Sequence, residues 1–469
     1  MAVIDGMFIL QGSDYVTIDG IDLQEAAANT TAATQMEVGY GLFKTSVTDG
    51  CQNVTIKNCA FSFGRASTIN GASWTGSTAI ASANAVWGAV STLLIPTALS
   101  GTNSNNTFSY NTITGGSAGI QVIGYLLDLT NALCDQNNTI SYNSVLDYGN
   151  ATTNSVHGII ISGQVGFLVN NNIVASSSTS KHAGTINGIF NANGGVGGDG
   201  IISYNLVTVH GGGTTTHTQG IRVQSGTSTA TITIANNKVY NSTHTTSTTG
   251  SFFGILVTGN AGTYNIINDT ITNNNIVGSA TYSGIISLIS VTTGTPTNVN
   301  IMGNSITNNS NLNGTLITAT GAVRVMDVSV GTNVLIRDNT IDGYTRQNSV
   351  STSTVGNLAG IYCAGGGSAQ CFVKHNTVNN IVYNGAGTGS PIVGIGTGAS
   401  ANLVVDSNTV TNLTNNKTTG TSIIYGIYDG SAVPIANYNY NVVSNLTSAG
   451  PTTIYGMNFA TGAWYENGI

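Results

Sequence analysis

Five charged or ionisable residues stand at matching places in three consecutive copies of a sequence repeat. Arg337, Lys374 and Asp406 each come two residues before the asparagine of the repeat, and Asp338 and His375 come directly before it in the first two copies. Because neighbouring copies of such a repeat stack about 4.8 Å apart, we expect these five groups to lie within roughly 5–10 Å of one another. There His375 or Lys374 could act as a base, with Asp338 orienting it and Arg337 binding a sugar acid. The alternative is a surface ladder of ion pairs that limits self-association.

Few other side chains are spaced for catalysis or metal binding. No two acidic residues are adjacent in the sequence, whereas hydrolysis of a glycosidic bond needs two or three carboxylates around that bond. The histidines fall near expected loops without the spacing of metal ligands, and the chain has no Cys-x-x-Cys pair. The sequence therefore predicts neither a metal site nor a cofactor, and nothing in it indicates Ca²⁺.

The composition gives no sign of several other classes of partner. Charged residues make up 6% of the 469 residues and the formal net charge is -7, so the charge pattern does not indicate nucleic acid or an anionic membrane. No apolar run approaches the roughly 18 residues of a membrane span, and no signal peptide is predicted at the N-terminus. Ser, Thr, Asn and Gly supply the polarity instead, so we expect an extracellular or bacterial cell-surface protein.

These five residues, which we call the charged patch, are positioned by a repeat with the pattern apolar-x-x-Asn-x-apolar. Asparagine tolerates the left-handed backbone of a sharp corner, and its amide can bond the same residue one coil above and below. Identical side chains about 4.8 Å apart then form a ladder. Two earlier copies carry Asp19 and Cys59 at this place. The twelve asparagines are Asn111, Asn143, Asn171, Asn205, Asn237, Asn274, Asn304, Asn339, Asn376, Asn408, Asn441 and Asn467.

Each repeat also carries strand signals. A Gly-Ile-x-Val-like run, as at 119–122, precedes an alternating run before the asparagine, as at 231–234, and a third short strand is expected after it. Three short strands in about 30 residues are typical of a parallel β-helix. The sequence therefore predicts an all-β fold and a single domain over residues 1–469. It would have about 14 coils of roughly 26–38 residues, with a long loop insertion near 65–105.

The asparagine ladder and the strand pattern resemble the right-handed parallel β-helices of the pectin-lyase-like class. The segment Gly-Ser-Asp-Tyr-Val-Thr-Ile-Asp-Gly-Ile at 12–21 is similar to β-helix segments of large secreted bacterial surface proteins. The resemblance implies right-handed winding, in agreement with the general preference of crossovers. It also implies that an enzyme of this kind would carry clustered acids, or acids with Lys or Arg, on one outer face, and calcium or another cation in the lyases. The hydrolase-like sequences Asn-Thr-Asp, Asp-Asp, Gly-His-Gly and Arg-Ile-Lys are absent.

The cysteines leave two interpretations open. Cys363 and Cys371 should both point inward from consecutive strands of one coil, so a disulfide across the corner could form between them. Buried free thiols that pack as small apolar residues are the other interpretation.

A second candidate surface is a column of outward residues on the Gly-Ile-x-Val strands, most of them apolar or aromatic. A large exposed apolar stripe usually marks an interaction surface, and aromatic rings can also stack on sugars. Alternatively, long Ser/Thr loops fold over the column. The column reads Phe8, Phe43, Gln121, Ile160, Phe190, Arg222, Leu256, Ile286, Arg324, Tyr362, Gly396, Tyr428 and Asn458.

Together these patterns predict a non-catalytic structural β-helix, part of a secreted or cell-surface adhesin, stalk or fibre. It would self-associate side by side or end to end, because the sequence begins and ends inside the repeat without a capping helix, which leaves strand edges uncovered. One alternative is a polysaccharide lyase or glycoside hydrolase that acts at the charged patch. Another is a carbohydrate-binding module that uses the aromatic column. Glycans are the expected ligands, and neither nucleic acid nor a membrane span is expected.

Overall fold

The computed structural model describes residues 5–65, 70–71, 74–90, 92–125, 130–149, 155–192, 197–224, 226–277, 282–311, 322–347, 358–366, 369–384, 391–418, 421–431, 433–459 and 464–465. Contacts within the chain group it into two compact units. The first comprises Met1–Gly211, Gly220–Asn237 and Gly259–Gly262, and the second comprises Gly212–Gln219, Lys238–Thr258 and Thr263–Ile469. A single domain over residues 1–469 stays a prediction.

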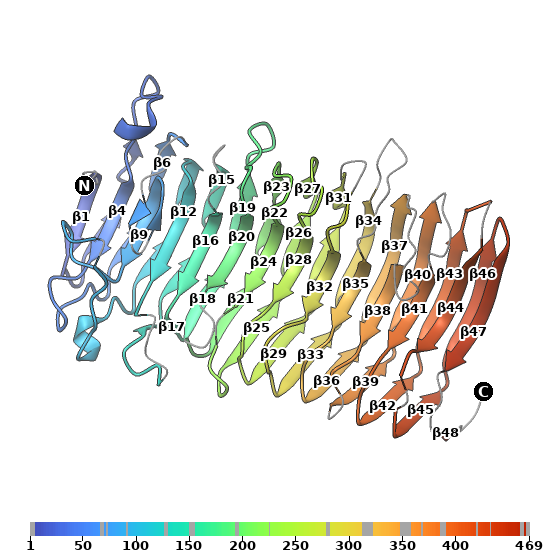
Figure 1. The fold of residues 1–469 in the computed structure, drawn as a ribbon. Coiled ribbons are helices and arrows are strands. Elements are labelled where there is room, and N and C mark those ends of the chain that lie inside the picture. The colour runs from blue at the N-terminus through green and yellow to red at the C-terminus, as the bar shows by residue number, and fades with distance from the viewer. Residues whose placement is uncertain are drawn as a thin grey trace. The chain divides into compact units, whose positions relative to one another are not determined.

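In the first unit the chain passes through three parallel sheets in turn, and neighbouring strands of a sheet come from successive coils (Figure 1). The first sheet contains β1 (Gly6–Gln11), β4 (Val38–Phe43), β9 (Thr78–Ala83), β12 (Ala118–Ile123), β16 (Val156–Ser162) and β20 (Ile186–Ala192). The second contains β2 (Thr17–Asp19), β5 (Thr55–Lys57), β10 (Thr107–Ser109), β14 (Thr139–Ser141), β18 (Phe167–Asn170), β21 (Gly200–Ser203) and β25 (Thr231–Ala235). The third contains β3 (Leu23–Gln24), β6 (Ala60–Phe63), β11 (Thr112–Gly115), β15 (Ser144–Tyr148), β19 (Ile173–Ser176) and β22 (Leu206–Thr208).

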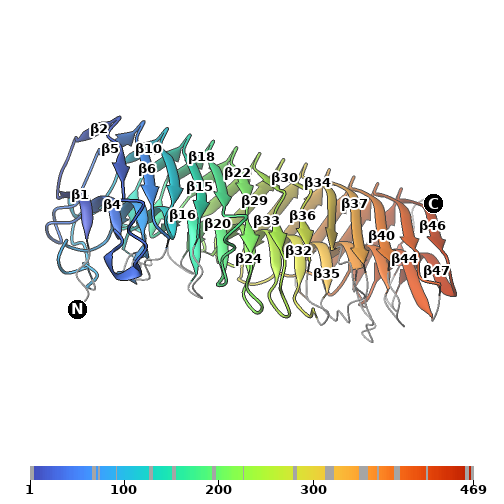
Figure 2. The same ribbon diagram turned by 90° about the horizontal axis from the view of Figure 1, so that it is seen from above.

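The second unit repeats this arrangement, and Figure 2 shows its strands succeeding one another in chain order. Its first sheet contains β28 (Phe252–Val257), β32 (Ile286–Val291), β35 (Val323–Val328), β38 (Leu358–Cys363), β41 (Ile392–Thr397), β44 (Ser422–Asp429) and β47 (Thr452–Phe459). Its second contains β29 (Thr263–Ile267), β33 (Asn298–Met302), β36 (Asn333–Arg337), β39 (Gln370–Lys374), β42 (Asn402–Asp406), β45 (Ile435–Asn439) and β48 (Trp464–Tyr465). Its third contains β26 (Lys238–Tyr240), β30 (Thr270–Thr272), β34 (Ser305–Asn311), β37 (Thr340–Gln347), β40 (Thr377–Asn384), β43 (Thr409–Asn415) and β46 (Val442–Ser448).

The remaining elements are short. β24 (Thr218–Val223) contains residues of both units. β7 (Asn70–Gly71) pairs with β8 (Trp74–Thr75), and β13 (Asp135–Gln136) pairs with β17 (Gln164–Val165). The others are β23 (His210–Gly211), β27 (Thr243–His244), β31 (Asn275–Ile276) and the 3-10 turns η1 (Ala32–Thr34) and η2 (Leu99–Gly101).

The predicted fold class is confirmed, because both units are parallel β-helices with almost no helix in the part of the chain that the structure describes. The solenoid has about 12 turns rather than the 14 expected. This difference is minor, because the larger number includes the first and last coils, in which β3 and β48 have only two residues each. Among the described residues, no helix combines the length and apolar character that a membrane crossing requires.

Alternation of side chains along each strand explains why these segments form a solenoid. In β25 the burial alternates residue by residue, with Ile232 and Ile234 buried and the intervening threonines at the surface. Successive coils keep the same register, so one inward column of the first unit reads Ile18, Ile56, Phe108, Ile140, Val169, Ile202 and Ile234. Burying each such side chain contributes about 1.5–3 kcal/mol to folding, which offsets the entropy of ordering the coil.

The expected insertion at 65–105 is shorter than predicted. The strand β9 lies inside this range and pairs with β4 and β12 as a regular member of the first sheet. The prediction missed β9 because its run Thr-Ala-Ile-Ala-Ser-Ala is built of small residues and lacks the Gly-Ile-x-Val signal. The irregular chain therefore lies on either side of β9.

Candidate functional site

The asparagine ladder is a buried structural feature. The side-chain oxygen of Asn143 accepts hydrogen bonds from the backbone N–H of Asn111 at 3.0 Å and from its Nδ2 at 2.9 Å. Nδ2 of Asn143 in turn donates to the side-chain oxygen of Asn172 at 3.0 Å and to the carbonyl of Phe108 at 2.9 Å. Similar bonds continue through Asn205 and Asn237 in the first unit and, in the second, through Asn304, Asn339, Asn376, Asn408 and Asn441. In Asn143, Asn172 and Asn205 the side-chain oxygen accepts two hydrogen bonds and Nδ2 donates two, so these amides have no hydrogen-bonding capacity left for a ligand.

Two predicted ladder residues lie elsewhere. Asn171 adopts the left-handed backbone with φ of 55° that precedes the ladder, and its neighbour Asn172 occupies the rung. Asn274 belongs to a second, shorter ladder, in which its oxygen accepts from Ser242 N–H at 2.9 Å and its Nδ2 donates to Asn309 at 2.9 Å. In that coil Asp269 takes the rung of the main ladder and donates its backbone N–H to the side-chain oxygen of Asn304 at 2.8 Å.

The ladder position in the first coil is also different from the prediction. Asp19 pairs in register with Lys57, two residues before Cys59, so Ile21 stands where the other coils carry asparagine. Asp19 instead forms an ion pair with Lys57 at 3.2 Å. The last predicted rung, Asn467, lies outside the described residues.

The structure brings the five residues of the charged patch together on the surface of the second unit. Arg337, Lys374 and Asp406 pair in register at the ends of β36, β39 and β42. Asp338 bridges two of its neighbours, because one carboxylate oxygen lies 2.9 Å from Arg337 Nε and the other lies 3.5 Å from His375 Nδ1. Arg337, Asp338 and His375 are 48%, 49% and 55% exposed.

The two corner residues of this patch are set by the backbone. Asp338 and His375 have φ of 57° and 53°, in the left-handed region, and each directly precedes a ladder asparagine. Their backbone N–H groups donate to the carbonyls of Lys374 at 3.2 Å and Asp406 at 3.0 Å. The side chains therefore point outward in a fixed row. Because one oxygen of Asp338 is paired with Arg337 and the other faces His375, and all three side chains are about half exposed, the arrangement is that of a solvated polar network.

The outward column of the first sheet is placed differently from the prediction at four positions. Phe8, Phe43 and Ile286 do not belong to it: Phe8 stands in register with buried Tyr40, and Phe43 and Ile286 are themselves buried. Arg324 is outward but stands in the neighbouring column, opposite Ser287. In the first unit the observed column is Ile9, Gly41, Ala81, Gln121, Ile160 and Phe190. In the second unit it is Leu256, Ser290, Asp327, Tyr362, Gly396, Tyr428 and Asn458.

The second unit carries a group of aromatic and charged side chains on this sheet, which we call the tyrosine face. Arg324 Nη1 donates to both oxygens of Asp327, at 3.0 and 3.1 Å, and its guanidinium lies 3.8 Å from the centre of the Tyr362 ring. Burial raises the pKa of Tyr362, while the nearby Arg324 lowers it. Its members are Arg324, Asp327, Tyr362, Tyr425, Tyr428 and Tyr455.

Three further tyrosine rings complete this face on β44 and β47. The Tyr425 ring lies 4.6 Å from that of Tyr428 and is stacked on that of Tyr455 at 5.4 Å. Glycines on β41 and just after it make room for Tyr362, because a Cβ added at Gly396 would lie 3.2 Å from its Cδ2. The rings of Tyr362, Tyr425 and Tyr428 are half-buried, whereas Tyr455 is 38% exposed.

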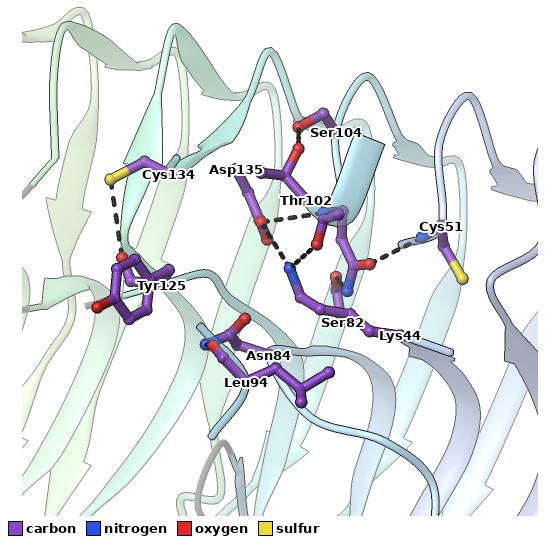
Figure 3. Close-up of polar contacts among 12 residues, drawn as sticks. Lys44, Cys51, Ser82, Asn84, Leu94, Thr102, Ser104, Tyr125, Cys134 and Asp135 are labelled. Carbon is purple, nitrogen blue, oxygen red and sulfur yellow. Dashed lines mark hydrogen bonds and ion pairs between the residues drawn. The ribbon is translucent and has the colours of Figure 1, made fainter. Parts of the chain in front are cut away.

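Sequence reasoning missed a buried ion pair in the first unit. Lys44, directly after β4, and Asp135, at the start of β13, are both 0% exposed, with Nζ 3.6 Å from Oδ1 (Figure 3). Burial lowers the pKa of Lys44 and raises that of Asp135, and in each case the charge of the partner opposes the shift. The two residues are 91 positions apart, from 135 minus 44, and no local motif links them. The pair becomes visible only in the folded structure.

A second buried charge lies in the second unit. Arg346 on β37 is 1% exposed. Burial lowers the pKa of Arg346, and the charges of the nearby Tyr383, Tyr344 and Tyr282 oppose this shift. No sequence pattern indicated this site, because the long strand β37 (Thr340–Gln347) extends beyond the short third strand that was expected and turns Arg346 inward near its end.

Cys363 and Cys371 are buried free thiols, one of the two alternatives open from the sequence. They contact each other, and this contact together with burial raises the pKa of the Cys363 thiol. Among the described residues, no group of three or more His, Cys, Asp or Glu side chains is arranged to hold a metal ion.

Comparisons with known proteins assign this chain neither a family nor a function. No protein-family model matches the chain, and no curated protein matches it. One similar solved structure is a cysteine-to-alanine mutant of the DFA-IIIase from Arthrobacter chlorophenolicus A6 in complex with DFA-III. The two chains are 10% identical, with a TM-score of 0.27, over 96% of this chain and 92% of the other.

Proposed function

We propose that this chain is a non-catalytic β-helix that binds carbohydrate through the tyrosine face of its second unit. The observation that carries this proposal is the row of partly exposed tyrosine rings beside the Arg324–Asp327 pair on an outward sheet surface. Outward residues of a solvated sheet are ordinarily polar, so a cluster of aromatic rings there indicates an interaction surface. As in the sequence-based expectation, such a protein would act at an extracellular or bacterial cell surface as an adhesin, stalk or fibre.

Carbohydrate fits this face better than an apolar protein segment does. The C–H faces of sugar rings pack on aromatic rings, and tyrosine also offers a hydroxyl at its rim. Arg324 adds donors beside the rings, and it is held in place by Asp327, a buried carboxylate that also accepts from Ser329 Oγ at 3.0 Å. A site that is fixed before binding loses little side-chain entropy when the ligand arrives.

The two aspartates at the tyrosine face, Asp327 and Asp429, are engaged in ways that disfavour hydrolysis at this face. A glycosidase needs one carboxyl group that donates a proton and a second that acts as base or nucleophile across the bond. Asp327 is held by Arg324, and Asp429 accepts from the Tyr438 hydroxyl at 3.0 Å. Because both carboxyl groups serve internal contacts, binding without turnover is the simpler proposal.

A glycan array followed by titration calorimetry tests the proposal. We expect Tyr425→Ala and Tyr428→Ala to weaken binding of the glycan found on the array by about tenfold or more, because each removes a stacking ring worth about 1.4 kcal/mol. Tyr110→Ala is the matched control, since Tyr110 is a 57% exposed tyrosine of the first unit. Failure of every glycan to bind, or equal losses in the control and the test variants, would rule out this face.

One observation supports a second candidate, a polysaccharide lyase or glycoside hydrolase that acts at the charged patch. His375 lies 3.5 Å from Asp338, the contact that an oriented base requires, and Lys374 stands beside it in the sequence. A screen for unsaturated or reducing-end products on uronate and neutral glycans separates the two candidates. Product formation that disappears in Lys374→Ala and His375→Ala would establish the enzyme and refute the non-catalytic proposal.

A further inference from the structure

The interior of the first unit contains an amine and a carboxyl group that face each other away from water. Lys44 Nζ lies 3.6 Å from Asp135 Oδ1, and both side chains are 0% exposed (Figure 3). They come from coils far apart in the chain, on either side of the irregular segments around β9. Nothing in the ladder or the tyrosine face uses either group.

Hydrogen bonds fix both partners. The backbone N–H of Asn103 donates to Asp135 Oδ1 at 3.0 Å, and Gln164 Nε2 lies 3.5 Å from Oδ2. Lys44 Nζ donates to the carbonyl of Gly101 at 2.6 Å. Asn103 is itself anchored, since its Nδ2 donates to Ser82 Oγ at 3.1 Å. The amine and the carboxyl carbon are therefore held in one relative position rather than meeting by chance.

The surroundings also favour the uncharged forms of both groups. Removing a charge from water is costly, so burial shifts a lysine toward the free amine and an aspartate toward the carboxylic acid. The pKa of Lys44 is lowered and that of Asp135 is raised by this burial. A neutral amine is a nucleophile and a protonated carboxyl group is an electrophile, whereas the corresponding ion pair is unreactive toward amide formation.

We propose that Lys44 and Asp135 join in an intramolecular isopeptide bond. The Nζ lone pair attacks Cγ of the protonated Asp135 carboxyl group and forms a tetrahedral intermediate. One proton moves from Nζ to the hydroxyl group of this intermediate, the C–O bond breaks, and water leaves. An amine and a carboxylic acid thus give one amide and one water molecule, with no oxidant, reductant or other reactant.

The same neighbours stabilise this reaction. The Asn103 N–H donates to Oδ1, and with Oδ1 as the carbonyl oxygen it stabilises the negative charge that develops there as Nζ adds to Cγ. The Gln164 amide faces Oδ2, which then carries the proton and leaves as water. Fixed geometry replaces the entropy cost of a bimolecular encounter, and effective concentrations of about 10⁵ M or more are known for well-oriented groups. The dry interior disfavours the reverse hydrolysis, because water is the second reactant of that step.

The mass of the intact, denatured chain tests the proposal directly. We expect the purified wild-type chain to be lighter than its sequence by one water molecule. Proteolysis followed by fragmentation should yield a branched peptide in which the segments around Lys44 and Asp135 are joined, and trypsin should fail to cleave after Lys44. The branched peptide is found in the wild-type chain, so it decides the question even if a variant does not fold.

A matched pair of variants separates this bond from other losses of water. We expect Lys44→Met to regain the full mass of its sequence, whereas Lys374→Met, which removes a surface lysine, keeps the deficit. Cyclisation at Asp-Gly sequences, such as 49–50 or 199–200, also releases water but persists in Lys44→Met and gives no branched peptide. A wild-type chain of full mass, or a deficit without the branched peptide, overturns the proposal.

Discussion

The two units place their best-defined charge pairs in opposite surroundings. In the first unit Lys44 and Asp135 are 0% exposed inside the coil, whereas in the second Arg337 and Asp338 are 48% and 49% exposed at a corner. Arg337 and Asp338 are neighbours in the sequence, whereas Lys44 and Asp135 are 91 positions apart and meet only in the folded chain. Both pairs combine a basic side chain with an aspartate. The contrast shows that burial, rather than the pairing of a basic side chain with an aspartate, decides how strongly such a contact affects the fold.

The free energy expected from the two pairs differs severalfold. Breaking a buried ion pair by removing one partner costs about 3–5 kcal/mol, because the other group is left uncompensated in a low-dielectric interior. An exposed pair contributes about 0.2–1 kcal/mol, since water solvates each group nearly as well as its partner does. The buried pair is therefore the more important for the fold, although its residues carry no recognisable motif.

The largest effect is expected for the buried pair. Asp135→Ala should lower the free energy of unfolding by at least about 3–5 kcal/mol, because it leaves Lys44 buried without its partner and also removes the amide bond proposed above. Asp338→Ala is the matched control at the exposed pair and should change stability by no more than about 1 kcal/mol. Chemical denaturation of both variants gives the comparison. Equal losses would show that burial does not separate the two sites.

The next effect is expected at a ladder asparagine. Asn143→Ala removes the acceptor for Asn111 and the donor to Asn172, and leaves buried polar groups unsatisfied. We expect a loss of about 2–3 kcal/mol, since each unsatisfied buried group costs about 1–3 kcal/mol and part of this is relieved by relaxation. Tyr142→Ala, the exposed residue directly before it, is the control for thermal unfolding. A loss no greater than in the control would mean that the ladder adds nothing.

Acid should next lower the stability of the first unit through a buried histidine, His157. Burial lowers the pKa of His157 from 6.5 to about 3, with nearby Arg222 and His182 adding to the shift. Because the folded-state pKa lies below the unfolded value, this stability is fully present above pH 6.5 and is lost as the pH falls toward 3. At pH 5 the loss is about 2 kcal/mol, at 1.36 kcal/mol for each pH unit below 6.5.

Unfolding measured from pH 7 to pH 5 checks this sign. His157→Gln should remove the extra loss, so the stability of the variant falls less with acid than that of the wild-type chain. Ser178→Ala, an exposed position of the first unit without an ionisable side chain, serves as the control and should keep the wild-type pH dependence. Identical slopes in His157→Gln and the wild-type chain would contradict the prediction.

The smallest effect is expected from salt at the charged patch. Arg337→Ala should cost at most about 1 kcal/mol at low ionic strength, and this difference should vanish in 1 M salt, where the screening length is about 3 Å. The cost of Asp135→Ala should survive the same salt, because ions do not enter the interior. Denaturation curves of the two variants in low and high salt provide the measurement. A salt-insensitive Arg337→Ala would show that the patch is more than a solvated network.

The fold class could be predicted from the sequence because the same pattern of apolar residues and asparagine recurs in nearly every coil. Where the ladder residue of one coil was assigned wrongly, the adjacent repeats still placed that coil correctly, as with Asn171, which was chosen in place of Asn172. Errors arose where a copy departs from the rule. Asp269 replaces asparagine on the main ladder, and the spacing from Asn237 to Asp269 and on to Asn304, 32 and then 35 residues, would have revealed it.

The outward column failed for a related reason. The prediction used the nearest glycine to align each strand, but Leu288 and Val325 stand at the glycine position in β32 and β35. The alignment therefore slipped to Ile286 and Arg324, which lie at other positions on those strands. The strand register is irregular at this position, so simple alternation does not hold across it. Ile286 is buried although it lies four residues before Ser290 of the observed column, and Arg324 is outward although it lies three residues before Asp327.

The charged patch was predictable and the buried charges were not. Arg337, Lys374 and Asp406 each stand at a fixed distance from a repeat asparagine, so alignment alone places them together. Lys44 and Asp135 lie in irregular segments beside the strands, where no repeat position can be assigned. Their meeting depends on how the chain around β9 returns to the coil, which composition and periodicity do not encode.

The corner before the ladder has a consequence for protein engineering. Tyr110, Tyr142, Asn171 and Tyr204 all take the same left-handed backbone in successive coils of the first unit, and Tyr110 and Tyr142 stack with ring centres 4.8 Å apart. The same corner accepts Asp338, His375 and Ser407 in the second unit, so the backbone tolerates side chains of very different chemistry there. Within either unit this corner therefore provides a line of attachment points. Dyes, metal-binding groups or charges could be placed along it one coil, or about 4.8 Å, apart.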